Sequence, residues 1–187
     1  MSELAEIKRA ARKAAFVRRA EAHRGDTGAG ARRLGDVLQA WRGVPISGYL
    51  PIRTEIDPRP AMAGAAAHGP VAVPVIQGTG QPLLFSRWTP DCALRDGPFG
   101  AQVPLVDEFI EPQILIVPLV AFDRGGGRLG YGVGFYDRTL ALLRSRRATR
   151  AIGFAYAAQE ADALPLEPSD QPLDMVVTEA EVICFGA

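Results

Sequence analysis

The sequence predicts an α/β fold in which a largely parallel sheet lies between two layers of helices, α/β/α, in a single domain over residues 1–187. Helical and strand-like patterns alternate along the chain, which is typical of parallel sheets covered on both faces. The chain is long enough for one full hydrophobic core, and its content of 48% hydrophobic and 22% charged residues is ordinary for a globular protein. It shows no internal repeat, low-complexity tract or linker.

The first half of the chain supplies two helices before its first strand. Residues 2–24 predict a helix with Leu4, Ile7, Ala11, Ala14 and Ala15 on one side and basic residues on the other. Asp26 or Thr27 could cap a second helix, which has an apolar stripe for the core. That stripe consists of Leu34, Val37, Leu38 and Trp41. A strand at 44–50, a short helix at 60–68 and strands at 71–76 and 83–88 follow.

Residues 90–106 are rich in proline, glycine and charge, and they are predicted to form a loop that covers a site. The apolar run 114–122 then leads into a glycine-rich segment, followed by a helix that reaches residue 144. The remaining predicted elements are a strand at 150–156, a short helix at 157–163 and final strands at 175–178 and 182–185.

Charge and cysteine usage limit the partners. A formal net charge of +0 gives no overall field to gather nucleic acid or a membrane surface. The longest apolar run is too short to span a bilayer, and the N-terminus begins with charged residues rather than an apolar core. Cys92 and Cys184 lack the spacing of a zinc site or a disulfide framework. We expect a cytoplasmic monomer that binds a small molecule and neither nucleic acid nor membrane.

The glycine-rich segment from Asp123 to Arg138 carries the strongest chemical signal. Glycines at 130, 132 and 134 let the backbone N–H groups approach a ligand closely. The helix that begins near Phe135 adds free N–H groups and Arg128 adds a cation, so this junction predicts a phosphate site.

Asp137 lies in the first turn of that helix. A carboxylate repels a bound polyphosphate unless Mg²⁺ lies between them, so Asp137 is a candidate metal ligand. Alternatively, the glycines only make a turn and Asp137 only complements the helix dipole.

Four further residues are ambiguous from spacing alone. Lys8 and Arg12 project together from one turn of helix, as phosphate ligands or as a solvated basic face. Glu55 follows the carboxyl end of a strand, where open α/β sheets bind ligands, but it could be an ordinary loop charge. Asp170 could be an ordinary turn aspartate.

A resemblance to a known protein family favours the functional interpretation of each of these residues. Pro118-Leu-Val-Ala-Phe-Asp123, followed by Gly127-Arg-Leu-Gly-Tyr-Gly-Val-Gly-Phe-Tyr-Asp137, closely resembles the signature of the 5-formyltetrahydrofolate cyclo-ligase (5,10-methenyltetrahydrofolate synthetase) family. The resemblance implies a three-layer α/β fold. It also implies ATP- and Mg²⁺-dependent conversion of 5-formyltetrahydrofolate to 5,10-methenyltetrahydrofolate, with release of ADP and phosphate, through an N5-iminium phosphate.

The resemblance also implies roles for individual residues. Lys8, Arg12 and Arg128 would be the catalytic cations on the ATP phosphates, and Asp137 and Asp170 would hold Mg²⁺. Glu55 would anchor the folate, since its carboxylate can accept two hydrogen bonds from the pterin. The full ATP-binding set is Lys8, Arg12, Arg128, Leu129, Gly130, Tyr131, Gly132, Val133, Gly134, Phe135 and Tyr136, and the folate-binding set is Glu55, Phe99 and Tyr136.

Phe99 could stack on the pterin or could instead pack onto the core. The sequence departs from the family pattern where Val133 replaces Gly or Lys, where Phe135 replaces Tyr and where Ser169 replaces a larger ring. The side chains of Val133 and Phe135 cannot donate hydrogen bonds, although their backbone roles survive.

Two other classes of function compete with the enzyme. One is a non-catalytic nucleotide- or folate-binding relative of the same fold. The set Lys8, Arg12, Arg128 and Asp137 argues against it, because a pure binder needs no metal carboxylate beside the γ-phosphate. The other is a nucleic-acid-binding protein that uses the basic first helix, which a chain of net charge +0 makes less plausible.

Overall fold

The computed structural model describes residues 3–186, and its centre is a seven-stranded sheet in the order β11-β10-β9-β6-β1-β2-β3. The five central strands, β10, β9, β6, β1 and β2, all run parallel to one another. The edge strands β3 and β11 each pair antiparallel with their neighbour. The largely parallel α/β fold predicted from the sequence is therefore confirmed. The strands are β1 (Ile46–Ser47), β2 (Val71–Val75), β3 (Leu84–Arg87), β6 (Ile114–Pro118), β9 (Arg150–Phe154), β10 (Met175–Val177) and β11 (Val182–Cys184).

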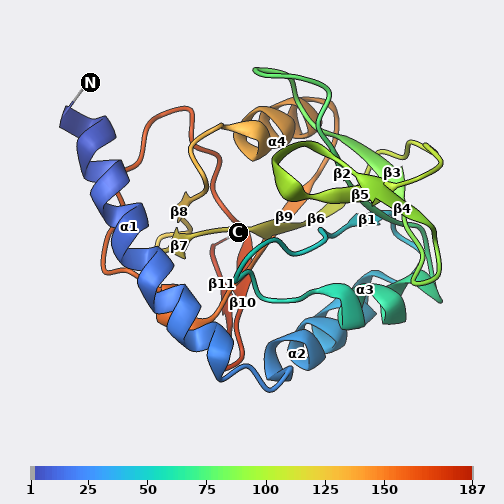
Figure 1. Ribbon diagram of the computed structural model, residues 1–187, viewed down its shortest axis with the longest axis horizontal. Helices are drawn as coiled ribbons and strands as arrows, with labels where there is room; N and C mark the ends of the chain where they lie inside the picture. The colour runs from blue at the N-terminus through green and yellow to red at the C-terminus, as the bar shows by residue number, and fades with distance from the viewer. Residues whose placement is uncertain (1–2, 187) are drawn as a thin grey trace.

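Helices cover both faces of this sheet (Figure 1). α2 (Ala29–Leu38) and α3 (Arg59–Ala66) lie on one face, and α4 (Phe135–Arg146) lies on the other. Alternate residues of β6 divide between the two layers: Ile114 and Ile116 pack with α2 and α3, whereas Leu115 and Val117 pack with α4. A central parallel strand is buried on both faces, which is why this segment is a continuous apolar run in the sequence.

The helix α1 (Glu3–Arg24) runs along one side of the molecule, beside the small hairpin of β7 (Ala121–Phe122) and β8 (Arg128–Leu129) (Figure 1). Ala15 packs there against Ala121 and Leu129. The apolar face predicted for α1 is wrong in part, because Ile7 is 49% exposed whereas Lys8 and Arg19 are buried. α1 therefore covers a polar region with two of its basic residues.

Several element ends differ from the prediction. Neither Asp26 nor Thr27 caps α2; the helix begins after Gly28, whose φ of 74° is left-handed, and Asp26 instead accepts a hydrogen bond from the Gly28 N–H. Trp41 falls in a 3₁₀ turn, η1 (Gln39–Trp41). The short helix expected at 157–163 is the 3₁₀ turn η3 (Ala157–Gln159).

Residues 90–106 form a hairpin rather than an irregular loop. β4 (Leu94–Asp96) and β5 (Gln102–Pro104) pair antiparallel, and η2 (Pro98–Gly100) makes the tip. This tip carries Phe99 in a left-handed backbone conformation, with φ of 59°. Within residues 3–186, none of the helices is both long and apolar enough to cross a membrane.

Candidate active site

The glycine loop, residues 130–134, joins β8 to the first turn of α4. Gly132 and Gly134 have φ of 94° and 72°, a left-handed conformation in which side chains are strained. At Gly132 a Cβ would also lie 3.2 Å from the Arg12 guanidinium carbon. Tyr131 and Val133 are 36% and 37% exposed, so this loop faces solvent and a ligand can reach it.

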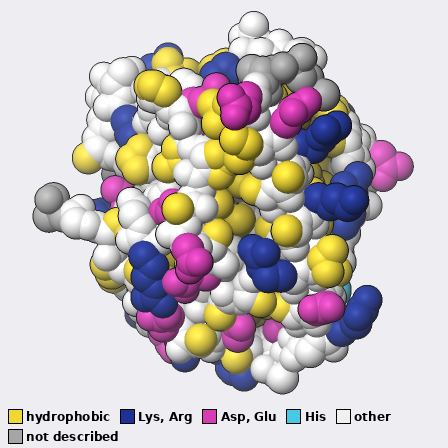
Figure 2. Space-filling model, turned by 90° about the vertical axis from the view of Figure 1, so that its left-hand side faces the viewer, with side chains coloured by type: hydrophobic (Ala, Val, Ile, Leu, Met, Phe, Trp, Pro, Cys, Tyr) yellow, Lys and Arg dark blue, Asp and Glu magenta, His cyan; other side chains and the backbone are white. Residues whose placement is uncertain are grey.

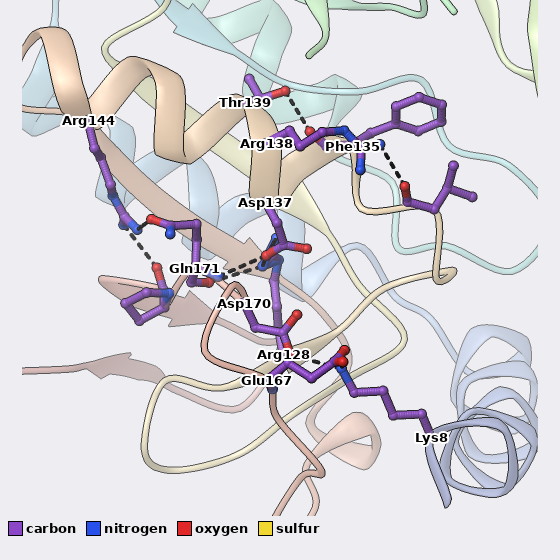
Figure 3. Close-up of polar contacts among 12 residues, drawn as sticks. Lys8, Arg128, Phe135, Asp137, Arg138, Thr139, Arg144, Glu167, Asp170 and Gln171 are labelled. Carbon is purple, nitrogen blue, oxygen red and sulfur yellow. Dashed lines mark hydrogen bonds and ion pairs between the residues drawn. The ribbon is translucent and has the colours of Figure 1, made fainter. Parts of the chain in front are cut away.

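Two basic side chains of α1 approach the glycine loop and the segment that follows β9. Arg12 Nε donates a hydrogen bond of 2.8 Å to the Gly130 carbonyl oxygen. Lys8 Nζ lies 2.6 Å from Glu167 Oε2 and 3.0 Å from Asp170 Oδ2 (Figure 3). Burial acts to lower the pKa of Lys8, but the hydrogen bonds to the two carboxylates outweigh it and raise the pKa above its ordinary value. The ammonium group of Lys8 is therefore buried and paired with two carboxylates, and it is not part of a solvated basic face.

Arg128 and Asp137 form a partly buried ion pair beneath the loop. Arg128 Nη2 and Nη1 lie 2.7 and 3.1 Å from Asp137 Oδ1, and Nη1 also donates to the Gln171 carbonyl oxygen at 3.1 Å. Burial lowers the pKa of Arg128, while the nearby Asp137 and Asp170 act to raise it. Figure 3 shows Asp137 and Arg128 directed toward one another, with Asp170 beside them. The two predicted metal ligands therefore flank the same arginine.

The donor set fits Mg²⁺ that is bound mainly through a nucleotide. In the structure of residues 3–186, the recorded contacts of Asp137 use Oδ1 and those of Asp170 use Oδ2, which leaves one oxygen of each carboxylate for a cation. No cluster of three or more His, Cys, Asp or Glu side chains suited to a metal occurs in this part of the chain. Mg²⁺ commonly takes one or two carboxylates and completes its octahedron with phosphate oxygens and water.

Glu55 lies on the other side of the glycine loop and is linked to it. The Tyr131 hydroxyl donates to Glu55 Oε1 at 3.0 Å, and the Ile52 N–H donates to Oε2 at 2.9 Å. Glu55 is 5% exposed, and burial raises its pKa even though these hydrogen bonds and Arg19 act to lower it. The interpretation of Glu55 as a solvated loop charge is therefore wrong.

Tyr136 lies between the two sides of the site. Its hydroxyl is buried and has no hydrogen-bond partner among residues 3–186. Burial raises the pKa of this hydroxyl, and the charge of Glu55 raises it further while that of Arg128 opposes the rise. A buried hydroxyl without a partner costs free energy, which a bound ligand would recover by hydrogen bonding to it.

Phe99 extends from the hairpin tip toward α4. Its ring lies 6.1 Å from that of Phe135, edge to face, and 68% of the residue is exposed. The alternative in which Phe99 packs onto the core is therefore wrong, because most of the residue is exposed. The ring lies beside the start of α4, where it is accessible to a ligand on the glycine loop.

Comparison with known proteins identifies the family. Residues 4–179 match the model of the 5-formyltetrahydrofolate cyclo-ligase family. The 5-formyltetrahydrofolate cyclo-ligase of Escherichia coli K12 is 35% identical over 144 residues, which cover 72% of this chain and 77% of that protein. The chain belongs to the 5-formyltetrahydrofolate cyclo-ligase family. The Haemophilus influenzae cyclo-ligase is 42% identical over 96 residues, 49% of this chain and about half, 51%, of that protein.

Solved structures agree with this membership. The 5,10-methenyltetrahydrofolate synthetase of Aquifex aeolicus matches with a TM-score of 0.78 and 27% identity, covering 97% of this chain and 94% of that one. The synthetase of Mycoplasma pneumoniae has a TM-score of 0.71 at 23% identity and supports the fold alone. The predictions of a cyclo-ligase family enzyme and of its fold are confirmed. The roles of individual site residues in this cyclo-ligase family member stay predictions.

Three residues of the candidate site are absent from the sequence-based prediction. Glu167 and Gln171, which contact Lys8 and Arg128, lie on either side of Asp170, and no pattern in the sequence marks either of them. Arg19 was detectable, because it continues the helical spacing of Lys8, Arg12 and Ala15 along one face of α1. The resemblance places Tyr131 in the ATP-binding set, and the structure shows that its hydroxyl also reaches Glu55.

The face that carries α1 shows Lys and Arg side chains interspersed with Asp and Glu (Figure 2). Among the described side chains, this face presents no continuous basic surface. It therefore gives no support to a nucleic-acid partner, which would require a basic patch or stripe.

Proposed function

We propose that this cyclo-ligase family member converts 5-formyltetrahydrofolate to 5,10-methenyltetrahydrofolate with ATP and Mg²⁺, acting as a cytoplasmic monomer. One observation carries the proposal. The exposed glycine loop is bordered by the cations of α1 on one side and is linked to buried Glu55 through Tyr131 on the other. A nucleotide on the loop and a pterin on Glu55 would therefore be neighbours.

The reaction requires activation of an inert carbonyl group. The formyl group on N5 is an amide, so its carbon is a poor electrophile and its oxygen a poor leaving group. Transfer of the ATP γ-phosphoryl group to the formyl oxygen gives an N5-iminium phosphate and ADP. N10 then attacks the formyl carbon, the C–O bond breaks, phosphate departs and the N10 proton is lost to solvent, which closes the ring.

The nucleotide side of the site supplies charge neutralisation and alignment, on which phosphoryl transfer mainly depends. Lys8, Arg12 and Arg128 place cations around the loop, and the free N–H groups at the start of α4 add partial positive charge. Asp137 and Asp170 would hold Mg²⁺ through their remaining oxygens. When bound, Mg²⁺ would neutralise phosphate charge as it develops.

The folate side supplies orientation. Glu55 would accept hydrogen bonds from the ring N–H and amino group of the pterin, because an ionised carboxylate has about four acceptor positions and only two are used by Tyr131 and Ile52. The buried Tyr136 hydroxyl would find its missing partner on the substrate. Phe99 would stack on the exposed ring face.

The test follows absorbance of the methenyl product after protein, 5-formyltetrahydrofolate and Mg-ATP are mixed. We expect product formation that stops when ATP is omitted or Mg²⁺ is chelated. Arg124→Gln is a matched control, because Arg124 is an exposed arginine paired with Glu160 and Glu181 outside the site. Tight binding of ATP or folate with no product would instead identify the non-catalytic relative.

A further inference from the structure

We propose that Arg19 and Tyr131 are positioning residues that couple the nucleotide and folate sites, so that each substrate binds more tightly when the other is present. The inference rests on the proposed function. Its basis is a continuous chain of hydrogen bonds from α1 through the glycine loop to Glu55.

Arg19 is the buried hub of this chain. It is 1% exposed; its Nη2 donates to the Tyr131 hydroxyl at 2.9 Å and its Nε donates to Thr54 Oγ1 at 3.1 Å. The guanidinium carbon lies 5.1 Å from the centre of the Phe16 ring and 5.6 Å from that of Tyr131. One arginine therefore fixes both the Tyr131 side chain and the residue that precedes Glu55.

Stability alone does not account for a charged residue in this position. A buried guanidinium is costly unless it is well paired, and no ion pair between Arg19 and a carboxylate is recorded within residues 3–186. Its Nη1 is buried without a hydrogen-bond partner in the same part of the chain. The Tyr131 hydroxyl, which accepts a hydrogen bond from Arg19 and donates one to Glu55, links this cation to the Glu55 carboxylate. This arrangement orients Glu55 through Tyr131.

Tyr131 belongs to both sites. Its backbone lies in the glycine loop between Gly130 and Gly132, where a nucleotide would contact N–H groups, and its hydroxyl holds Glu55 Oε1. Burial, followed by the charge of Glu55, raises the pKa of Tyr131 to about 12, so the hydroxyl keeps its proton and remains the donor at neutral pH.

Coupling follows from this shared residue. A nucleotide that binds the loop further restricts the motion of Tyr131, and a pterin that binds Glu55 restricts the same side chain through its hydroxyl. The second ligand then meets a site that is already ordered and loses less conformational entropy on binding. By linkage, each ligand must improve the affinity of the other by the same factor.

The experiment measures the Kd of 5-formyltetrahydrofolate by calorimetry, with and without Mg²⁺ and a non-hydrolysable ATP analogue. For the wild type we expect the ratio of the two values to be on the order of 5-fold or more. In Tyr131→Phe and Arg19→Met we expect the ratio to fall toward one, whereas Arg19→Lys, which keeps a donor and the charge, should restore part of it. Arg18→Gln is the matched control, since Arg18 is on the same helix but its Nε bonds the Ala158 carbonyl oxygen.

The outcomes separate the two proposals. A purely structural role would lower the melting temperature of the variants and leave the affinity ratio unchanged, which would overturn the coupling. A wild type that turns over substrate with a ratio of one would also overturn the coupling, while the proposed function would stand. A wild type that neither binds 5-formyltetrahydrofolate nor forms product would overturn the proposed function, and the coupling with it.

Discussion

Arg128 donates from both terminal nitrogens to a single oxygen of Asp137, Oδ1, at 2.7 and 3.1 Å. The Gln171 N–H donates to the same oxygen at 2.8 Å. One oxygen of Asp137 therefore has a structural role, and the other is left for a cation. Asp137 thus differs from a simple helix-dipole partner, because the side chain also ties α4 to β8 and to the segment before β10.

Asp137→Asn should lower both stability and turnover. The variant leaves the buried Arg128 charge without its partner, and we expect a loss of about 1–3 kcal/mol, less than for a fully buried pair because the Asp137 side chain is 25% exposed. Turnover should fall by more than about 100-fold at fixed Mg²⁺, since a metal ligand and a counter-charge are both lost. Urea unfolding and a Mg²⁺ titration of the rate measure the two effects.

The control for this prediction is Asp174→Asn, which disrupts an ion pair of 2.9 Å with Arg144 farther along the same segment. It should lose stability and keep its dependence on Mg²⁺. Turnover of Asp137→Asn close to that of the wild type would rule out its role at the metal.

Glu167 pairs with the ammonium group of Lys8, which the proposed function assigns to the ATP phosphates. Its carboxylate lies 2.6 Å from Nζ while its side chain is 50% exposed, so it can move aside. Glu167→Gln removes a competing charge, and the KM for ATP should fall by about 2–5-fold, in line with the modest strength of exposed ion pairs. Lys8→Met should raise this KM, and added salt should reduce the difference. A higher KM for ATP in Glu167→Gln would show that Glu167 helps to hold the phosphate site instead.

Local sequence patterns were sufficient for most of the fold but not for the contacts that complete the site. The glycine spacing and the start of α4 depend on neighbouring residues, so the junction was predictable. Lys8 and Glu167 are separated by 159 positions, and no local pattern indicates that they meet. The sequence predicts both Arg128 and Asp137 at the site, but their direct pairing depends on how the glycine loop places the first turn of α4 beside β8.

The errors have a common physical cause. A periodic pattern predicts an apolar buried face for a helix, whereas α1 buries Lys8 and Arg19, which contact polar groups that lie far away in the sequence. In the same way, β4 is exposed at each of its positions and lacks the alternation that marks a half-buried strand. The hairpin that carries Phe99 was therefore predicted as a loop.

The buried carboxyl group of Glu55 should make the free energy of unfolding depend on pH. Burial raises the pKa of its carboxyl group above the ordinary value, so the folded state binds the proton more tightly than the unfolded state. The resulting stability is present at low pH and is lost as the pH rises through the folded-state pKa. Glu55→Gln cannot titrate, so its melting temperature minus that of the wild type should increase from about pH 4 to about pH 7.5.

Thermal unfolding across this pH range measures the difference directly. Glu6→Gln, which removes an exposed carboxylate from α1, is a control for the loss of a charge at the surface. A difference that stays constant or shrinks with rising pH would mean that the Glu55 pKa is not raised.

Phe99→Ala should weaken folate use without destabilising the fold. The residue is 68% exposed, so the free energy of unfolding should change by less than about 0.5 kcal/mol. Loss of a stacked ring should raise the KM for 5-formyltetrahydrofolate by about tenfold and leave the KM for ATP unchanged. Phe99→Trp, which keeps an aromatic face, should stay close to the wild type. Leu105→Ala is the matched control, because Leu105 is 57% exposed just after the same hairpin. If Phe99→Ala and Leu105→Ala changed the folate KM equally, the hairpin would act as a general cover and not through an aromatic contact.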